Sequence, residues 1–144
     1  MSAKPLLIYD GECRFCCRWI GAWKAVTGDG VSYERSQTAG QRFPQIAPED
    51  FMRSVQWVDA DGSICSGAEA VFSALATSTW QGRMALAVYR KVPVFARVAE
   101  SAYTGVAVHR GFFSALTRIL WGPDVRPPTH AVSTARRGAV RRAG

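Results

Sequence analysis

The sequence lacks the long apolar stretches that mark membrane-spanning and secreted proteins. No window of about 20 residues is free of charged side chains, which argues against a membrane-spanning helix. The first apolar run, residues 5–9, is too short for the hydrophobic part of a secretory signal. We therefore expect no stable membrane insertion and a cytoplasmic protein whose thiols are mostly reduced.

Cysteine and histidine are also scarce, and their placement limits what they can do. The chain has four cysteines and two histidines, and three of the cysteines fall within residues 13–17, too close together to staple distant parts of a fold. A closed zinc site needs four ligands, and the sequence has neither a second CxxC pair nor an HxxxH pair. We predict no metal and no bound organic cofactor. A zinc protein that uses Cys13 and Cys16 stays open as an alternative.

What the chain does contain is enough apolar material for one core. It has 144 residues, of which 48% are hydrophobic, so a core can form without disulfide bonds.

The net charge is +7, and residues 123–144 contribute five arginines against one aspartate, or +4. We predict a core at 1–79, a helical extension packed on it within the same domain at 80–122, and a disordered basic tail at 123–144. Weak contact of this tail with nucleic acid is a minor alternative.

Apolar periodicity predicts an alternation of strands and helices. The expected strands are residues 4–9, 31–35, 54–59 and 64–65. The expected helices are residues 15–26, 66–76, 83–91, 93–108 and 112–121, with a helical turn at 48–52 and a loop or short helix at 36–43. A helix between the first two strands makes them parallel, and a turn signal at residues 60–63 makes the last two antiparallel. The predicted fold is α/β, a thioredoxin/glutaredoxin-like mixed four-stranded sheet with a C-terminal helical extension.

Two cysteines stand where the first strand gives way to the first helix. Cys13 falls at the start of the helix, where unpaired backbone N–H groups and the positive end of the helix dipole favour a thiolate. The thiolate is the form that attacks a disulfide. Cys16 follows one turn later on the same face. This spacing predicts that Cys13 attacks and Cys16 resolves the mixed disulfide, in an enzyme that exchanges thiols and disulfides.

The residues around the two cysteines modify this expectation. Arg14 adds positive charge that favours the thiolate, and Phe15 offers an apolar contact surface for substrate. Asp10 repels a thiolate at Cys13 and so raises its pKa. Asp10 either accepts the proton of Cys16 during resolution or caps the turn before the helix. The sequence alone leaves both roles open.

The run of residues 9–16, Tyr-Asp-Gly-Glu-Cys-Arg-Phe-Cys, resembles the signature of the DCC family of thiol-disulfide oxidoreductases. The aspartate and two cysteines in that family's name fall on Asp10, Cys13 and Cys16. Residues 59–70 and 103–110 resemble two later family segments, the second with the pattern Y-x-x-x-A-x-x-R. The resemblance implies a thioredoxin-like fold, a protein-disulfide reductase-like activity, and a protein or a small thiol as the substrate.

One departure from thioredoxins concerns the place where substrate would bind. Thioredoxins have a cis-proline before the third strand, beside the dithiol, which helps to hold the substrate backbone. Here residues 53–55, Arg-Ser-Val, occupy that place. We predict Arg14, Phe15, Ser54 and Gly67 as the substrate-binding residues. If the dithiol is idle, the alternative is a non-catalytic thioredoxin-like binding module.

Several further residues receive structural interpretations. Cys17 and Cys65 are interpreted as small packing residues, and the five tryptophans as mainly core residues. Ser66 and Glu69 form a capping-box pattern at the start of a helix. Arg110 could bind an anionic group of the substrate, although we favour a structural role at a helix end.

Overall fold

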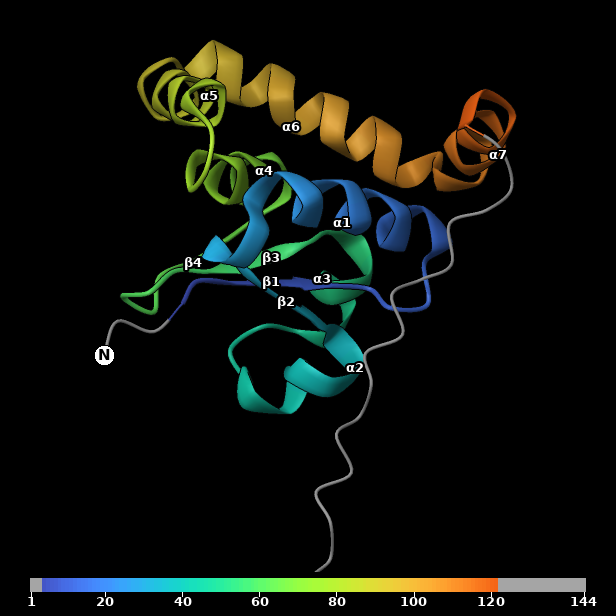
Figure 1. Cartoon of the computed structure of the whole chain (residues 1–144), viewed down its shortest axis with the longest axis horizontal. Helices are drawn as coiled ribbons and strands as arrows, with labels where there is room; N and C mark the ends of the chain where they lie inside the picture. Colours follow the sequence, from blue (N-terminus) through green and yellow to red (C-terminus); the bar gives the residue numbers. More distant parts are fainter. Residues whose placement is uncertain (1–3, 122–144) are drawn as a thin grey trace, which may run out of the picture.

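The computed structural model describes residues 4–121, which form a four-stranded sheet with helices on both faces (Figure 1). The strands are β1 (Leu6–Tyr9), β2 (Ser32–Arg35), β3 (Gln56–Val58) and β4 (Ile64–Ser66). The helices are α1 (Arg14–Thr27), η1 (Gly28–Gly30), α2 (Ser36–Ala39), η2 (Gly40–Arg42), α3 (Pro48–Arg53), α4 (Gly67–Ala76), α5 (Trp80–Lys91), α6 (Pro93–Val108) and α7 (Arg110–Trp121).

The sheet has the strand order β2-β1-β3-β4. β1 pairs in parallel with β2 and antiparallel with β3, and β3 pairs antiparallel with β4. The predicted mixed four-stranded sheet is therefore confirmed. Leu7 lies between Tyr33 of β2 and Trp57 of β3 and has no exposed surface. β1 is thus the central strand, and the dithiol turn leaves from its carboxyl end.

Alternate residues of β1 face two separate apolar layers, as a strand's period of two requires. Leu7 and Tyr9 belong to the core between the sheet and helices α1 and α4. Ile8 points to the opposite face and packs with Ala39 and Phe51 from the α2–α3 region. Burial on both faces explains why β1 is a continuous apolar run rather than an alternating one.

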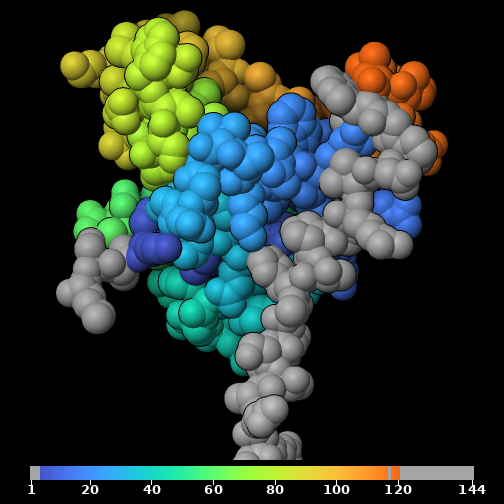
Figure 2. Space-filling view, viewed as in Figure 1, coloured from blue at the N-terminus to red at the C-terminus, as the bar shows by residue number. Residues whose placement is uncertain are grey.

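Helices α5, α6 and α7 form a further layer outside α1 and α4 (Figures 1 and 2). α5 and α6 pack against α4, and α7 packs against α1 and α6. Gly82 permits a close approach, since a Cβ there would lie 2.4 Å from the carbonyl carbon of Leu75. Phe113 of α7 contacts Phe15 of α1, with ring centroids 6.5 Å apart. The extension therefore returns to the helix that carries the dithiol.

Two helices begin two or three residues earlier than the periodicity predicted. α5 begins at Trp80 because the Thr79 hydroxyl accepts a hydrogen bond from the N–H of Gly82 at 3.0 Å, which caps the helix. α7 begins at Arg110, so that His109 alone separates it from α6.

The expectation that the tryptophans lie mainly on core faces is wrong for two of them. Trp57 is buried, but Trp19 and Trp80 are 41% and 64% exposed. The predicted basic tail and its nucleic-acid contact lie outside the described residues. Within residues 4–121, no helix is both long enough and apolar enough to cross a membrane.

Candidate dithiol site

The turn between β1 and α1 is ordered by Asp10 and by a residue from α2. The Asp10 carboxylate accepts hydrogen bonds from the N–H of Glu12 at 3.0 Å and from the side-chain amide of Gln37 at 3.2 Å. The amide oxygen of Gln37 accepts from the N–H of Gly11 at 3.2 Å. A Cβ on Gly11 would lie 2.6 Å from the Arg35 side chain, so glycine permits this close packing.

Cys13 is the N-cap residue of α1, and its sulfur accepts two hydrogen bonds. The backbone N–H of Cys16 donates to the Cys13 Sγ at 3.2 Å, and the Cys16 thiol donates to it at 2.6 Å. Both cysteines are free, and their sulfur separation exceeds the roughly 2.05 Å of a disulfide bond. The Cys13 sulfur therefore lies at a helix N-terminus, a place that favours a thiolate, beside a second sulfur one turn further on.

The hydrogen bond between the two sulfurs shifts their pKa values in opposite directions. The thiol of Cys16, donating to Cys13, lowers the pKa of Cys13 from its ordinary value of 9.0 to about 6, although burial opposes the change. The backbone N–H of Cys16 and the Arg110 guanidinium lower that pKa further. The pKa of Cys16 is raised, first by its hydrogen bond to Cys13 and then by burial. At neutral pH these shifts favour the thiolate form of Cys13 and the protonated form of Cys16.

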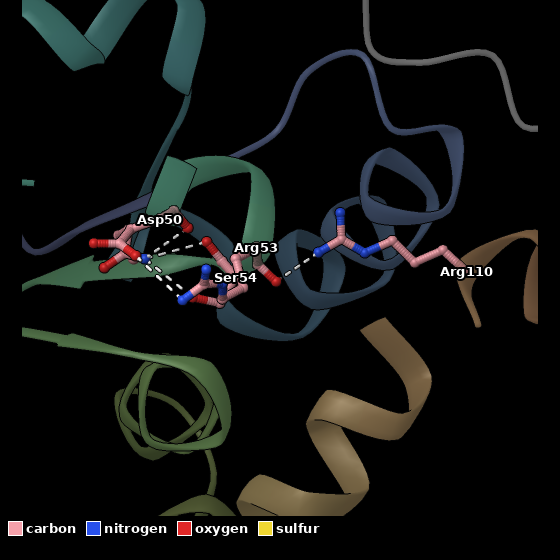
Figure 3. Close-up of polar contacts among 5 residues, drawn as sticks. Asp50, Arg53, Ser54 and Arg110 are labelled. Carbon is pink, nitrogen blue, oxygen red and sulfur yellow. Dashed lines mark hydrogen bonds and ion pairs between the residues drawn. The ribbon is translucent and has the colours of Figure 1, made fainter. Parts of the chain in front are cut away.

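Arg110, at the start of α7, contacts the segment that precedes β3. Its guanidinium donates to the carbonyl oxygens of Met52 at 2.9 Å and Arg53 at 2.8 Å, the second of which is drawn in Figure 3. These carbonyls lie at the carboxyl end of α3, where a cation is favoured by the helix dipole. The structural role favoured from sequence thus holds, but the charge also favours the thiolate of Cys13.

Tyr103 of α6 contacts the next part of the same segment. Its hydroxyl oxygen accepts a hydrogen bond from the backbone N–H of Val55 at 3.0 Å. Burial raises the pKa of Tyr103, so the phenol stays neutral. Tyr103 and Arg110 are the first and last residues of the Y-x-x-x-A-x-x-R pattern, so this pattern was the signal that could have revealed their shared role.

A pocket of about 510 Å³ lies between this segment, the start of α4 and helix α6. Two of the predicted substrate-binding residues, Ser54 and Gly67, line it. The other two do not: Arg14 is exposed on α1, and Phe15 packs against the rings of Trp19 and Phe113. The pocket is also lined by two cations and two anions, Arg53, Arg110, Glu49 and Glu100.

Gly67 has a structural reason to be glycine. Its φ is +65°, and a Cβ there would lie 2.5 Å from the Glu100 carboxylate. Glu100 accepts hydrogen bonds from the N–H of Glu69 at 3.4 Å and from the Tyr89 hydroxyl at 2.8 Å. The predicted capping box is wrong in detail, because Ser66 occupies the N-cap without a capping hydrogen bond. A carboxylate from α6 caps α4 instead.

Comparison with known families agrees with this geometry. The model of the DCC1-like thiol-disulfide oxidoreductase family matches residues 7–115, which is more than half of the chain. The chain belongs to this family. The family is one of thiol-disulfide oxidoreductases, so the substrate class is thiols and disulfides. The mixed four-stranded sheet agrees with a thioredoxin-like fold. No curated protein and no solved structure matches the chain.

In this DCC1-like oxidoreductase, the two other cysteines have different surroundings from the dithiol. Cys17 is 8% exposed, and its thiol donates to the carbonyl oxygen of Gly11 at 3.5 Å. Cys65 is half-buried with its sulfur 3.8 Å from the Ser73 hydroxyl. Burial raises the pKa of both thiols. Within the described part of the chain, no group of three or more His, Cys, Asp or Glu side chains is arranged to hold a metal ion.

Proposed function

We propose that the chain exchanges thiols and disulfides through Cys13 and Cys16, with Cys13 as the attacking residue and Cys16 as the resolving residue. One observation carries this proposal: the Cys16 thiol donates to the Cys13 sulfur at 2.6 Å at the start of α1. This bond stabilises a thiolate where it can attack and places the second sulfur within reach for resolution.

The reaction has two displacement steps. The Cys13 thiolate attacks one sulfur of a substrate disulfide, forms a mixed disulfide and releases the other half as a thiolate. Cys16 then gives up its proton and attacks the Cys13 sulfur, which releases the second half. The substrate has gained two electrons, and the chain holds a Cys13–Cys16 disulfide. A small thiol or a dithiol reductase returns the chain to the dithiol form, and the reverse sequence oxidises a dithiol substrate.

The neighbours of the dithiol have supporting roles in this proposal. Asp10 orders the turn through its hydrogen bonds to Glu12 and Gln37. Once the first step has consumed the thiolate, the reason for the raised pKa of Cys16 weakens, because the hydrogen bond to an anionic sulfur is its largest cause. Cys16 therefore becomes easier to deprotonate when it is needed.

The test is a redox cycle of the purified chain, followed by mass spectrometry. We expect reduced protein to lose two hydrogens on reaction with a disulfide, through a Cys13–Cys16 bond, and to regain them with excess dithiothreitol. Cys13→Ser should abolish the exchange. Cys16→Ser should stall as a mixed disulfide on Cys13.

Cys65→Ser is the matched control, because it removes a thiol outside the dithiol and should exchange at the unaltered rate. If wild-type protein cannot be cycled by any common thiol, the proposal is wrong and the non-catalytic binding module is favoured. Stoichiometric zinc bound to the two cysteines would favour the metal-binding alternative instead.

A further inference from the structure

The backbone that an extended substrate would use lies just before β3. Because Ile8 of β1 pairs with Gln56 of β3, residues 52–55 lie next to the end of β1, from which the dithiol turn leaves. An extended peptide binds beside such a segment by hydrogen bonds to free N–H and C=O groups. Whether these groups are free therefore decides what kind of substrate can bind there.

The chain itself already uses the polar backbone groups of Ser54 and Val55. The N–H of Ser54 donates to the carbonyl of Asp50 at 3.0 Å, and its carbonyl accepts from the side chain of Gln56 at 3.3 Å (Figure 3). The N–H of Val55 donates to the Tyr103 hydroxyl at 3.0 Å. The Val55 carbonyl accepts from the first N–H of α4 at 3.2 Å.

Arg110 donates hydrogen bonds to the two carbonyl oxygens that precede Ser54, so these are also in use. Two of its N–H groups hold the carbonyl oxygens of Met52 and Arg53, as Figure 3 shows for Arg53. Together with Tyr103, it places α6 and the start of α7 along the segment that an extended peptide would contact. A peptide backbone could bind here only by displacing these contacts.

The pocket beside this segment is lined by Arg110, whose charge acts on both Cys13 and Cys16, although the two cysteines do not line the pocket themselves. Its volume is about 510 Å³, within the range of small-ligand sites. Arg53 and Arg110 supply positive charge on its walls, and Glu49 and Glu100 supply negative charge. A compound that carries both carboxylate and ammonium groups complements this arrangement, whereas a neutral compound does not.

Building on the proposed function, we propose that the substrate is a small disulfide that bears both ammonium and carboxylate groups, rather than an extended polypeptide. The Cys13 thiolate attacks one sulfur of this disulfide and one small thiolate leaves. Cys16 then displaces the second, so the small disulfide becomes two thiols and the chain holds the Cys13–Cys16 disulfide. Two equivalents of an external thiol then reduce the Cys13–Cys16 disulfide and are themselves oxidised to a disulfide.

The first experiment compares two disulfides of matched reactivity with the reduced full-length chain. One is cystine, and the other is cysteine joined by a disulfide to the single cysteine of an extended peptide of about 12 residues. We expect cystine to react about tenfold faster or more, equivalent to about 1.4 kcal/mol of preference. Equal or faster reaction of the peptide would overturn the inference.

A second experiment tests the contacts that exclude a peptide. Tyr103→Phe removes the acceptor for the N–H of Val55 and leaves that group available to a substrate backbone. We expect the preference for cystine over the peptide to fall several-fold in this variant, with its fold checked by circular dichroism. An unchanged preference in a folded variant would contradict the role given to Tyr103.

A third experiment tests the charge complementarity, with bis(2-hydroxyethyl) disulfide as a neutral probe. Glu49→Gln should reduce the preference for cystine over the neutral disulfide, since it removes an anion from the pocket. Asp29→Asn is the matched control, because Asp29 is exposed in η1, away from the dithiol turn, and does not line the pocket. Equal effects of the two variants would argue against recognition in this pocket.

These outcomes separate this inference from the proposed function. If reduced protein reacts with no disulfide at all, including the neutral one, the exchange function itself fails. If it reacts with all of them but prefers the peptide, exchange stands and the small-substrate inference fails.

Discussion

The two sides of the dithiol are built in different ways. The turn of residues 10–17 is held mainly by hydrogen bonds between residues two to six positions apart. The facing segment of residues 52–55 is held by Tyr103 and Arg110, which lie 48 to 58 positions further along the chain. The comparison teaches that the largest cause of the lowered pKa of Cys13 is a local hydrogen bond, whereas the segment that faces the dithiol turn is held by the distant helical extension.

The largest effect should come from removing the local hydrogen bond to the nucleophile. In Cys16→Ala we expect the pKa of Cys13 to rise from about 6 toward its ordinary value. A thiolate reacts and a thiol does not, so alkylation of Cys13 follows the fraction ionised. At pH 7 that fraction should fall from roughly 90% to a few per cent. The measurement is the pH dependence of iodoacetamide labelling, read on the peptide that contains Cys13.

Cys16→Ser serves as the graded control for this prediction, because its hydroxyl can still donate to the Cys13 sulfur. Its labelling curve should lie between those of the wild type and Cys16→Ala. If Cys16→Ala labels with the wild-type pH dependence, then the helix start and Arg110 hold the thiolate by themselves, and the local side of the comparison is wrong.

The next largest effect should come from Arg110, which helps to hold residues 52–55 from the helical extension. Arg110→Met removes a charge that lowers the pKa of Cys13 and leaves the carbonyls of Met52 and Arg53 without their donor. We expect the labelling curve to move to higher pH, by less than in Cys16→Ala, because the hydrogen bond from Cys16 is the larger cause. The free energy of unfolding should fall by about 1 kcal/mol, which urea denaturation measures.

Arg110→Lys separates the two consequences. Lysine keeps the positive charge but cannot bind two carbonyls with a planar fork, so it should restore the labelling curve more fully than the stability. Arg118→Met is the matched control on the same helix, with an exposed arginine that should affect neither quantity. If Arg110→Lys restores stability but leaves the labelling curve displaced, the electrostatic link between Arg110 and the dithiol is wrong.

The same division explains what the sequence could and could not predict. The dithiol, its helix and the parallel pairing of β1 with β2 follow from spacing and periodicity over short stretches. Gln37 could not be placed at the Asp10 turn because its contact crosses 27 positions, from a stretch with no clear period. The Y-x-x-x-A-x-x-R pattern was visible, but its contacts with residues 52–55 arise only when α6 folds back over α4.

The cap of helix α4 also shows that short-range sequence patterns miss contacts made by distant residues. Local rules assigned the cap of α4 to Ser66 and Glu69, which are close in sequence and have suitable side chains. The fold supplies Glu100 instead, from 31 positions beyond Glu69. The Glu100 carboxylate, which also accepts a hydrogen bond from the Tyr89 hydroxyl, takes the place of the local cap. No pattern in the sequence around α4 predicts this contact.

The smallest expected effect tests whether Asp10 does more than order its turn. The Asp10→Asn variant keeps a side-chain oxygen that can accept hydrogen bonds from Glu12 and Gln37. It lacks the negative charge that raises the pKa of Cys13. Removing a nearby negative charge favours the thiolate, so the labelling curve should move slightly to lower pH. The release of the second substrate thiol, followed by stopped flow, should change by less than about threefold, with Asp29→Asn as the control. A role for Asp10 as the proton acceptor of Cys16 would instead slow this step alone by about 100-fold or more.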